Sequence, residues 1–331
     1  MTGLAIKSVS CLIPGFGDEG AKFGELVPTA ELLENITNIN GRPGKIGSDF
    51  VAQRLGIESV AFTWTTSKIC RQFWRQRDGA QAALPYTAYP NACLYQMLAR
   101  AVGRAIAEGG PPFSVCAHLH IVTYPQPTLE YELVEVRQRA GIDHGDLHTL
   151  VIQQGCAGLF SALKTAQALL ASRQYAPDDT VLITAENNML PFVQQRSHAY
   201  ADIAQIDSWV FPAIFGEGVG AMVVGRAGEE TSPGVWKIDT LTDEIVETEW
   251  RVAPCWNDVR GCSEIVVRSK EVKQTYLTHV TGHAQRAIEA CGGPDRVHRL
   301  CLHESNPLLV KQVARRLNQG CRILTSFSEQ L

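Results

Sequence analysis

Short apolar runs alternate with helical stretches along most of this chain, and this alternation limits the folds that it can adopt. The runs lack a regular polar–apolar alternation, which is typical of strands buried on both faces of a sheet. The pattern predicts a layered α/β fold. Strands are expected at 6–13, 118–124, 147–153, 181–185, 220–225, 300–303 and 322–327. Helices are expected at 30–36, 92–108, 131–140, 159–172, 270–290 and 307–318.

The amino-acid composition limits the classes of protein to which this chain can belong. The 331 residues are 45% hydrophobic, enough for one large domain or two intimate halves. A net charge of −4 argues against a nucleic-acid or anionic-membrane partner. No apolar run reaches the length of a bilayer span, and the first residues lack a secretory signal pattern. The ten cysteines show no metal-ligand spacing, so we expect free thiols, a cytoplasmic protein and no metal site.

Cys156 stands in Val-Ile-Gln-Gln-Gly-Cys-Ala-Gly-Leu-Phe, residues 151–160. A β-rich run stops at a glycine, the cysteine and further small residues follow, and a helical stretch begins. This layout is typical of a nucleophile elbow, in which a sharp strand-to-helix turn exposes a reactive side chain. A helix N-terminus favours the thiolate, which is the nucleophilic form. The alternative is a cysteine that packs as a small hydrophobic residue.

His303 stands at the end of a predicted strand in Leu-Cys-Leu-His-Glu-Ser-Asn-Pro, residues 300–307. Asn306 occupies an N-cap position, and Pro307 occupies the first helical turn. A neutral imidazole beside a helix N-terminus is able to accept a proton or donate a hydrogen bond in acyl chemistry at a cysteine. The alternatives are a loop histidine bonded to backbone and an asparagine that only caps the helix.

Alternating glycines in Phe215-Gly-Glu-Gly-Val-Gly-Ala221 lead directly into a predicted strand. A phosphate-binding loop is disfavoured, because no Lys-Ser or Lys-Thr pair and no helix follow. The pattern, which includes Gly218 and Gly220, favours close approach of the backbone to another segment or to a substrate. A tight turn without ligand contact is an equally good interpretation.

Taken in series, these three segments resemble the β-ketoacyl synthase III (FabH-like) group of the thiolase superfamily. That family has Ala-Cys-(Ala/Ser)-Gly, Phe-Gly-Asp-Gly-Ala-Gly-Ala and His-Gln-Ala-Asn, in this order. The segment Gln53-Arg-Leu-Gly-Ile57 is similar to the family's Arg-Thr-Gly-Ile. By this resemblance, Arg54 lies at the pantetheine entrance, and Phe50 stands where a tryptophan often stacks on adenine.

The resemblance implies a thiolase-like fold of two similar βαβαβαββ halves in α-β-α-β-α layers. Residues 1–225 would form the half with the nucleophile, and residues 226–331 the half with the catalytic histidine. The family's later Gly-Asn-(Thr/Ser) segment, with its catalytic asparagine, does not follow before Leu331. We therefore expect the C-terminal half to be incomplete.

The implied activity is acyl transfer through a thioester on Cys156, with coenzyme A or phosphopantetheine thioesters as substrates and no permanently bound cofactor. His303 and Asn306 would complete the catalytic site, and Gly218 and Gly220 would contact substrate. Decarboxylative condensation in fatty-acid or polyketide-type biosynthesis, by a homodimer that uses acyl-coenzyme A or acyl carrier protein, is the main expectation. The alternatives are a non-condensing acyltransferase and a non-catalytic partner subunit of a ketosynthase.

Overall fold

The structure, a computed structural model, describes most but not all of the chain. The described residues are 3–32, 53, 56–75, 91–109, 114–123, 129–142, 147–172, 174–190, 214–228, 235–238, 252–257, 262–267, 269–303, 307–317 and 322–324. The chain divides into two compact units. Unit 1 comprises Met1–Val27, Val60–Ser197 and Phe215–Glu247, and unit 2 comprises Pro28–Ser59, His198–Ile214 and Thr248–Leu331. The predicted division into two similar halves at residue 225 stays a prediction.

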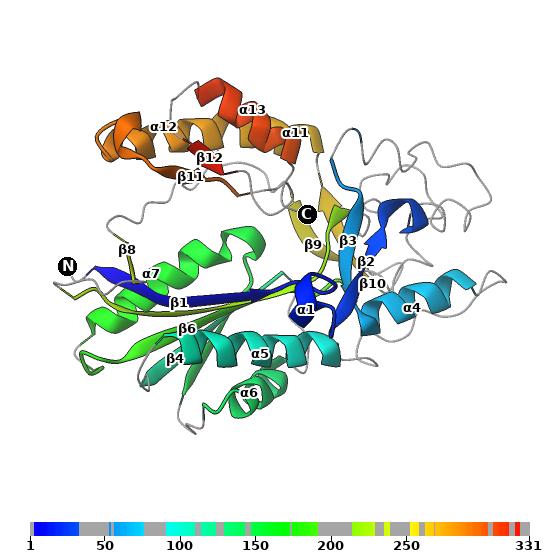
Figure 1. Ribbon diagram of the computed structural model, residues 1–331, viewed down its shortest axis with the longest axis horizontal. Coiled ribbons are helices and arrows are strands. Elements are labelled where there is room, and N and C mark those ends of the chain that lie inside the picture. Colours follow the sequence, from blue (N-terminus) through cyan, green and yellow to red (C-terminus); the bar gives the residue numbers. More distant parts are fainter. Residues whose placement is uncertain are drawn as a thin grey trace. The chain divides into compact units, whose positions relative to one another are not determined.

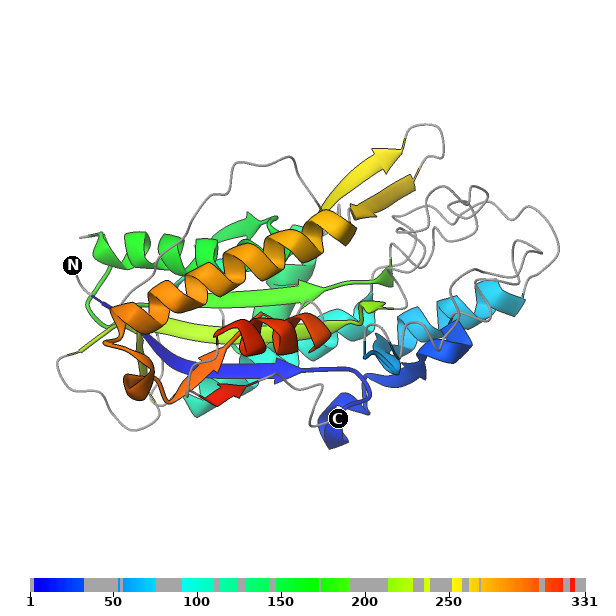
Figure 2. The same ribbon diagram turned by 90° about the horizontal axis from the view of Figure 1, so that it is seen from above.

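Unit 1 is built on a six-stranded sheet with the strand order β5-β4-β6-β7-β1-β8. Its strands are β1 (Leu4–Leu12), β4 (Val115–Val122), β5 (His148–Ile152), β6 (Thr180–Asn187), β7 (Gly218–Arg226) and β8 (Trp236–Ile238). β4 is parallel to β5 and β6, whereas β7 is antiparallel to both of its neighbours (Figures 1 and 2). The carboxyl ends of β1, β4, β5 and β6 therefore lie at one edge of the sheet.

Helices cover both faces of this sheet. The helices α5 (Ala92–Glu108) and α6 (Leu129–Arg139) lie on one face, and α7 (Gly158–Ala171) lies on the other (Figure 1). α5 begins where the Asn91 side chain accepts a hydrogen bond from the Leu94 amide, as an N-cap residue does. Its apolar residues recur every three or four positions and are buried in the core.

The path β1-α5-β4-α6-β5-α7-β6-β7 reproduces the βαβαβαββ order that the resemblance implies for a half. Between β1 and α5 the chain also forms α1 (Gly17–Gly20), the paired strands β2 (Gly24–Pro28) and β3 (Ser59–Thr63), and α4 (Trp64–Arg75). The sequence did not predict β2, β3 or α4. Of the helix expected at 30–36, residues 30–32 are helical, and the rest lies outside the described residues.

Unit 2 contains one long helix that comprises α11 (Ser269–Thr275), the π-helical turn η4 (Tyr276–Val280) and α12 (Thr281–Ala290), as Figure 2 shows. Beside this helix lies α13 (Pro307–Leu317), which connects the parallel strands β11 (Arg299–Cys301) and β12 (Arg322–Leu324). An antiparallel pair, β9 (Val252–Asn257) and β10 (Cys262–Val267), precedes them. None of the helices in the described ranges is both long and apolar enough to cross a bilayer.

Candidate functional site

Cys156 lies in a sharp turn between β5 and α7. β5 ends at Ile152, and Gly155 takes a φ of +49°, in the left-handed region that favours glycine. A 3₁₀ turn, Gly155–Ala157, places the cysteine two residues before the first residue of α7, Gly158. The Ala157 amide closes this turn on the Gln154 carbonyl at 3.1 Å. The cysteine side chain is exposed, and the local structure is the strand–turn–helix arrangement that the sequence predicts.

Gly158 allows the N-terminus of α7 to sit directly on the sheet. A Cβ atom at this position would overlap the Cγ2 methyl of Ile121, near the end of β4. The glycine after the alanine is therefore needed for packing, and the position of the Cys156 turn depends on it.

Protein atoms around Cys156 affect its ionisation. Burial raises the pKa of the Cys156 thiol, and a hydrogen bond at its own backbone amide opposes the rise only in part. The thiol is accessible to reagents, yet enough protein surrounds the sulfur to disfavour the charged form. Burial therefore acts against the thiolate that the start of α7 was expected to favour.

The edge of the sheet that carries Cys156 also carries polar side chains from the neighbouring strand ends. Thr123 follows β4 and donates a hydrogen bond to the Asn187 side chain at 3.3 Å. Asn187, the last residue of β6, donates in turn to the Gly216 carbonyl. These bonds connect two strand ends with the segment before β7. Ligands of open α/β sheets bind at such carboxyl edges.

Glu217, inside the glycine segment, is the centre of a buried polar network. Its carboxylate accepts hydrogen bonds from the Thr63 amide at 2.7 Å, the Thr66 hydroxyl at 2.8 Å, the Asn91 side chain at 2.9 Å and the Met189 amide at 3.1 Å. Burial raises the pKa of Glu217, and the hydrogen bonds from Thr63, Thr66 and Met189 lower it. The network connects the start of β7 with β3, α4, α5 and the end of β6.

The glycines around Glu217 have different surroundings. A Cβ atom at Gly216 would lie 2.9 Å from the Ala61 backbone nitrogen, so this glycine permits the close backbone approach that the pattern indicated. Gly218 and Gly220 lie within β7, between β1 and β6, where an added Cβ would meet its nearest neighbour at 3.7 and 3.9 Å. Their predicted contact with substrate stays a prediction.

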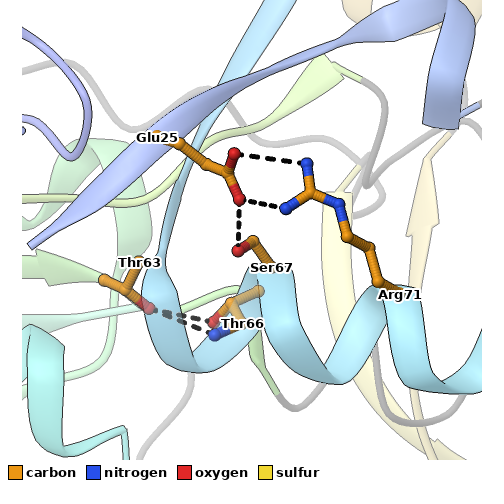
Figure 3. A network of polar contacts seen from close by, with 5 residues as sticks. All are labelled: Glu25, Thr63, Thr66, Ser67 and Arg71. Atoms are coloured by element: carbon orange, nitrogen blue, oxygen red, sulfur yellow. Dashed lines mark hydrogen bonds and ion pairs between the residues drawn. The ribbon is translucent and has the colours of Figure 1, made fainter.

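A second polar network fixes α4 against β2 (Figure 3). The Arg71 guanidinium bonds both carboxylate oxygens of Glu25, and the Ser67 hydroxyl donates to the same carboxylate at 2.7 Å. Nearby, the Thr63 hydroxyl lies 3.2 Å from that of Thr66, in the first turn of α4. These bonds give α4 a fixed place beside the Glu217 network.

Two histidines of β4 are fully buried. His118 Nε2 and His120 Nδ1 lie 2.6 and 2.7 Å from the same Thr184 hydroxyl on β6. Burial lowers the pKa of His120 to about 3 and that of His118 well below its usual value, and it raises the pKa of the nearby Glu186 to about 8.

His303 belongs to unit 2. It is exposed two residues after β11, and its backbone carbonyl accepts a hydrogen bond from the Tyr276 hydroxyl. Phe50, Arg54 and Asn306 lie outside the described residues. In the described part of the chain, no group of three or more His, Cys, Asp or Glu residues is arranged to hold a metal ion.

Among the comparisons with known proteins, only the comparison with solved structures gives a match. No family model and no curated protein matches the chain. The solved structure of AbyA1, a tetronic acid condensing enzyme, matches with a TM-score of 0.64 and 18% sequence identity, over 95% of this chain and 83% of that chain. The likeness confirms the predicted α/β fold of the thiolase type. At 18% identity, this likeness is evidence for the fold alone.

Proposed function

We propose that this protein is an acyltransferase that carries an acyl group as a thioester on Cys156. The observation that supports this most directly is the exposed Cys156 thiol in a strand–turn–helix bend, at the carboxyl edge of the sheet. This placement presents a nucleophile where α/β folds bind their ligands. The donor would be an acyl thioester of coenzyme A or of a carrier protein.

In the first half-reaction, the Cys156 sulfur attacks the thioester carbonyl. A new carbon–sulfur bond forms, the bond to the pantetheine sulfur breaks, and the proton of Cys156 passes through a base to the leaving thiol. The backbone amide of Cys156 would stabilise the oxyanion of the tetrahedral intermediate. Because the pKa of the thiol is raised, a base must accept its proton as the sulfur attacks. We assign that role, and charge stabilisation in the next step, to His303.

In the second half-reaction, decarboxylative condensation is the chemistry that we favour. A malonyl thioester loses carbon dioxide, and the resulting enolate carbon attacks the acyl carbonyl, which releases the Cys156 thiol. The solved structure that this chain resembles is that of a condensing enzyme, which is consistent with this choice. His303 and Asn306 would stabilise the enolate, and Gly218 and Gly220 would lie beside the substrate. Arg54 would lie at the pantetheine entrance, and Phe50 would stand where the adenine of coenzyme A stacks.

We also propose a homodimer, formed through β5, which is an outermost strand of the sheet in the described part of the chain. β5 ends the strand order of the sheet, and Leu150 and Val151 on it are exposed. Leu159 and Phe160, in the first turn of α7, are also exposed. An apolar edge strand left open in solution promotes pairing with another chain. Light scattering should find a dimer for the wild-type protein and a monomer for Val151→Lys.

Mass spectrometry of the intact protein after incubation with acyl-coenzyme A tests the proposed function. We expect one acyl adduct on the wild-type protein, none on Cys156→Ala, and an unchanged adduct on Cys11→Ala, which removes another exposed thiol of unit 1. An adduct that survives in Cys156→Ala would overturn the assignment. Malonyl-coenzyme A then separates the reactions: carbon dioxide release with a new carbon–carbon bond identifies condensation, and acyl transfer to an alcohol or amine identifies plain transfer.

A further inference from the structure

The long helix of unit 2 changes from α to π geometry over the turn η4, Tyr276–Val280. A π turn shifts the hydrogen-bonding pattern by one residue, and such turns occur mostly as isolated features, frequently at functional sites. In this turn the Leu277 carbonyl accepts two side-chain hydrogen bonds, from the Thr281 hydroxyl at 2.7 Å and from the Arg316 guanidinium at 3.0 Å. The turn therefore offers contacts to elements outside its own helix.

Tyr276, the first residue of η4, connects this turn to His303. Tyr276 is only 7% exposed, and it packs in a cluster that includes Val310 and Val313 of α13. Its hydroxyl donates to the backbone carbonyl of His303. Because the ring is held on its sides by packing, the hydroxyl fixes where that carbonyl points, and this restricts the backbone from which the imidazole projects.

Arg316 connects the same turn to the other side of the His303 segment. It lies in the last turn of α13, the helix that begins at Pro307, and it donates to the Leu277 carbonyl. Tyr276 and Leu277, which are adjacent in η4, thus bond the chain on both sides of residues 304–306. Tyr276 bonds the His303 carbonyl before these residues, and Leu277 accepts a bond from α13 after them.

We propose that Tyr276 is a positioning residue for His303, and that the π turn Tyr276–Val280, with Arg316, holds the segment on which His303 stands. This inference rests on the proposed function, because it gives His303 a catalytic task that needs a fixed direction. A single hydrogen bond of this kind contributes little to the stability of the whole protein. A misplacement of about 1 Å, however, is able to reduce a catalytic step by about 100-fold.

The test compares Tyr276→Phe, Arg316→Met and Thr281→Val. Tyr276→Phe removes only the hydroxyl, and Thr281→Val is the matched control, because the Thr281 bond stays within the long helix. Two readouts are needed: stopped-flow rates of Cys156 acylation and of the following transfer step, and the NMR titration of the His303 ring.

We expect Tyr276→Phe to slow the transfer step by about 10-fold or more and to shift the His303 titration, since the imidazole moves relative to its surroundings. Arg316→Met should do the same to a smaller extent, and Thr281→Val should change neither. Circular dichroism at the assay temperature must show each variant fully folded, so that loss of folded protein does not imitate the effect.

The outcomes separate the two proposals. If His303→Ala slows transfer while Tyr276→Phe changes neither the rate nor the titration, the positioning role is overturned and the proposed function stands. If Cys156 accepts no acyl group in any variant, the proposed function fails. The His303 titration of Tyr276→Phe still decides the positioning role in that case, because an unchanged titration rejects it.

Discussion

His120 Nε2 and Glu186 Oε2 face each other at 3.8 Å inside unit 1, and neither atom has a hydrogen-bond partner among the described residues. The bonds around them fix the proton positions. Arg137 only donates, so His118 Nδ1 accepts its bond at 3.1 Å, and a neutral His118 carries its proton on Nε2. His118 then donates to the Thr184 hydroxyl, which donates to His120 Nδ1. The proton of His120 is left on Nε2, directed at Glu186.

This arrangement predicts a pH dependence of stability. Burial raises the pKa of Glu186 from 4.5 to about 8, a rise that the Tyr95 hydroxyl opposes and the charges of Glu217 and Glu132 increase. The folded protein therefore keeps a proton that the unfolded chain loses above pH 4.5. As a result, the contribution of Glu186 to the free energy of unfolding falls as the pH rises from 4.5 towards 8. Burial lowers the pKa of His120 from 6.5 to about 3, so its contribution falls as the pH drops below 6.5.

Above pH 6.5 the effect of Glu186 is therefore separable from that of His120. We expect the free energy of unfolding of the wild-type protein, relative to Glu186→Gln, to fall by about 1.4 kcal/mol per pH unit between pH 6.5 and 7.5. Urea titrations at several pH values measure this difference. Parallel pH profiles for the two proteins would show that Glu186 is ionised in the fold. His120→Gln should leave the slope in this range nearly unchanged.

The alkylation rate of Cys156 should rise with pH throughout the neutral range and should not level off there. Because burial raises the pKa of its thiol, the thiolate fraction should increase about tenfold per pH unit through the neutral range. Peptide mass spectrometry after timed iodoacetamide treatment gives the alkylation rate of Cys156, with the exposed Cys11 as an internal reference in the same samples. A rate that levels off below pH 8 would mean that a neighbouring group stabilises the thiolate in solution.

Local sequence patterns predicted those elements of unit 1 in which the apolar residues recur at a regular spacing. The helix expected at 92–108 has these bounds in the structure, because its apolar spacing and its Asn91 cap agree. β2 was missed because its glycine, glutamate and proline resemble a loop in composition, and β3 because it is a short run of five residues without polar–apolar alternation. α4 was missed because its twelve residues mix aromatic, basic and hydroxyl side chains and are polar on average, although its apolar residues gather on one face of the helix.

The candidate site was predictable only where its geometry is local. The turn around Cys156 follows from glycines next to the cysteine, and the close approach at Gly216 follows from the alternating glycines. The Glu217 network does not, because its partners come from segments up to 154 residues away along the chain. The raised pKa of Cys156 was also missed, since it arises from atoms that only the folded chain brings around the sulfur.

Gly158 offers a test of the packing that positions the Cys156 turn. Gly158→Ala places a methyl group against Cγ2 of Ile121, so we expect a loss of about 1–3 kcal/mol in the free energy of unfolding. Ile121→Ala should also destabilise, by about 2–5 kcal/mol, because it leaves a cavity. Since the second change makes room for the first, the double variant should be more stable than the sum predicts, by at least about 0.5 kcal/mol. Strict additivity would contradict the contact.

Glu217→Gln tests whether the buried carboxylate organises the carboxyl edge of the sheet. Each of its four bonds with Thr63, Thr66, Asn91 and Met189 has the partner as donor, so the carboxylate accepts them all. A glutamine amide in place of one oxygen turns a donor towards another donor, which should reduce the free energy of unfolding by about 1–3 kcal/mol. Glu19→Gln is the matched control, since Glu19 forms exposed ion pairs and its loss should change stability little. Equal urea midpoints for the two variants would mean that Glu217 is already protonated in the fold, and that the bonds to it contribute little.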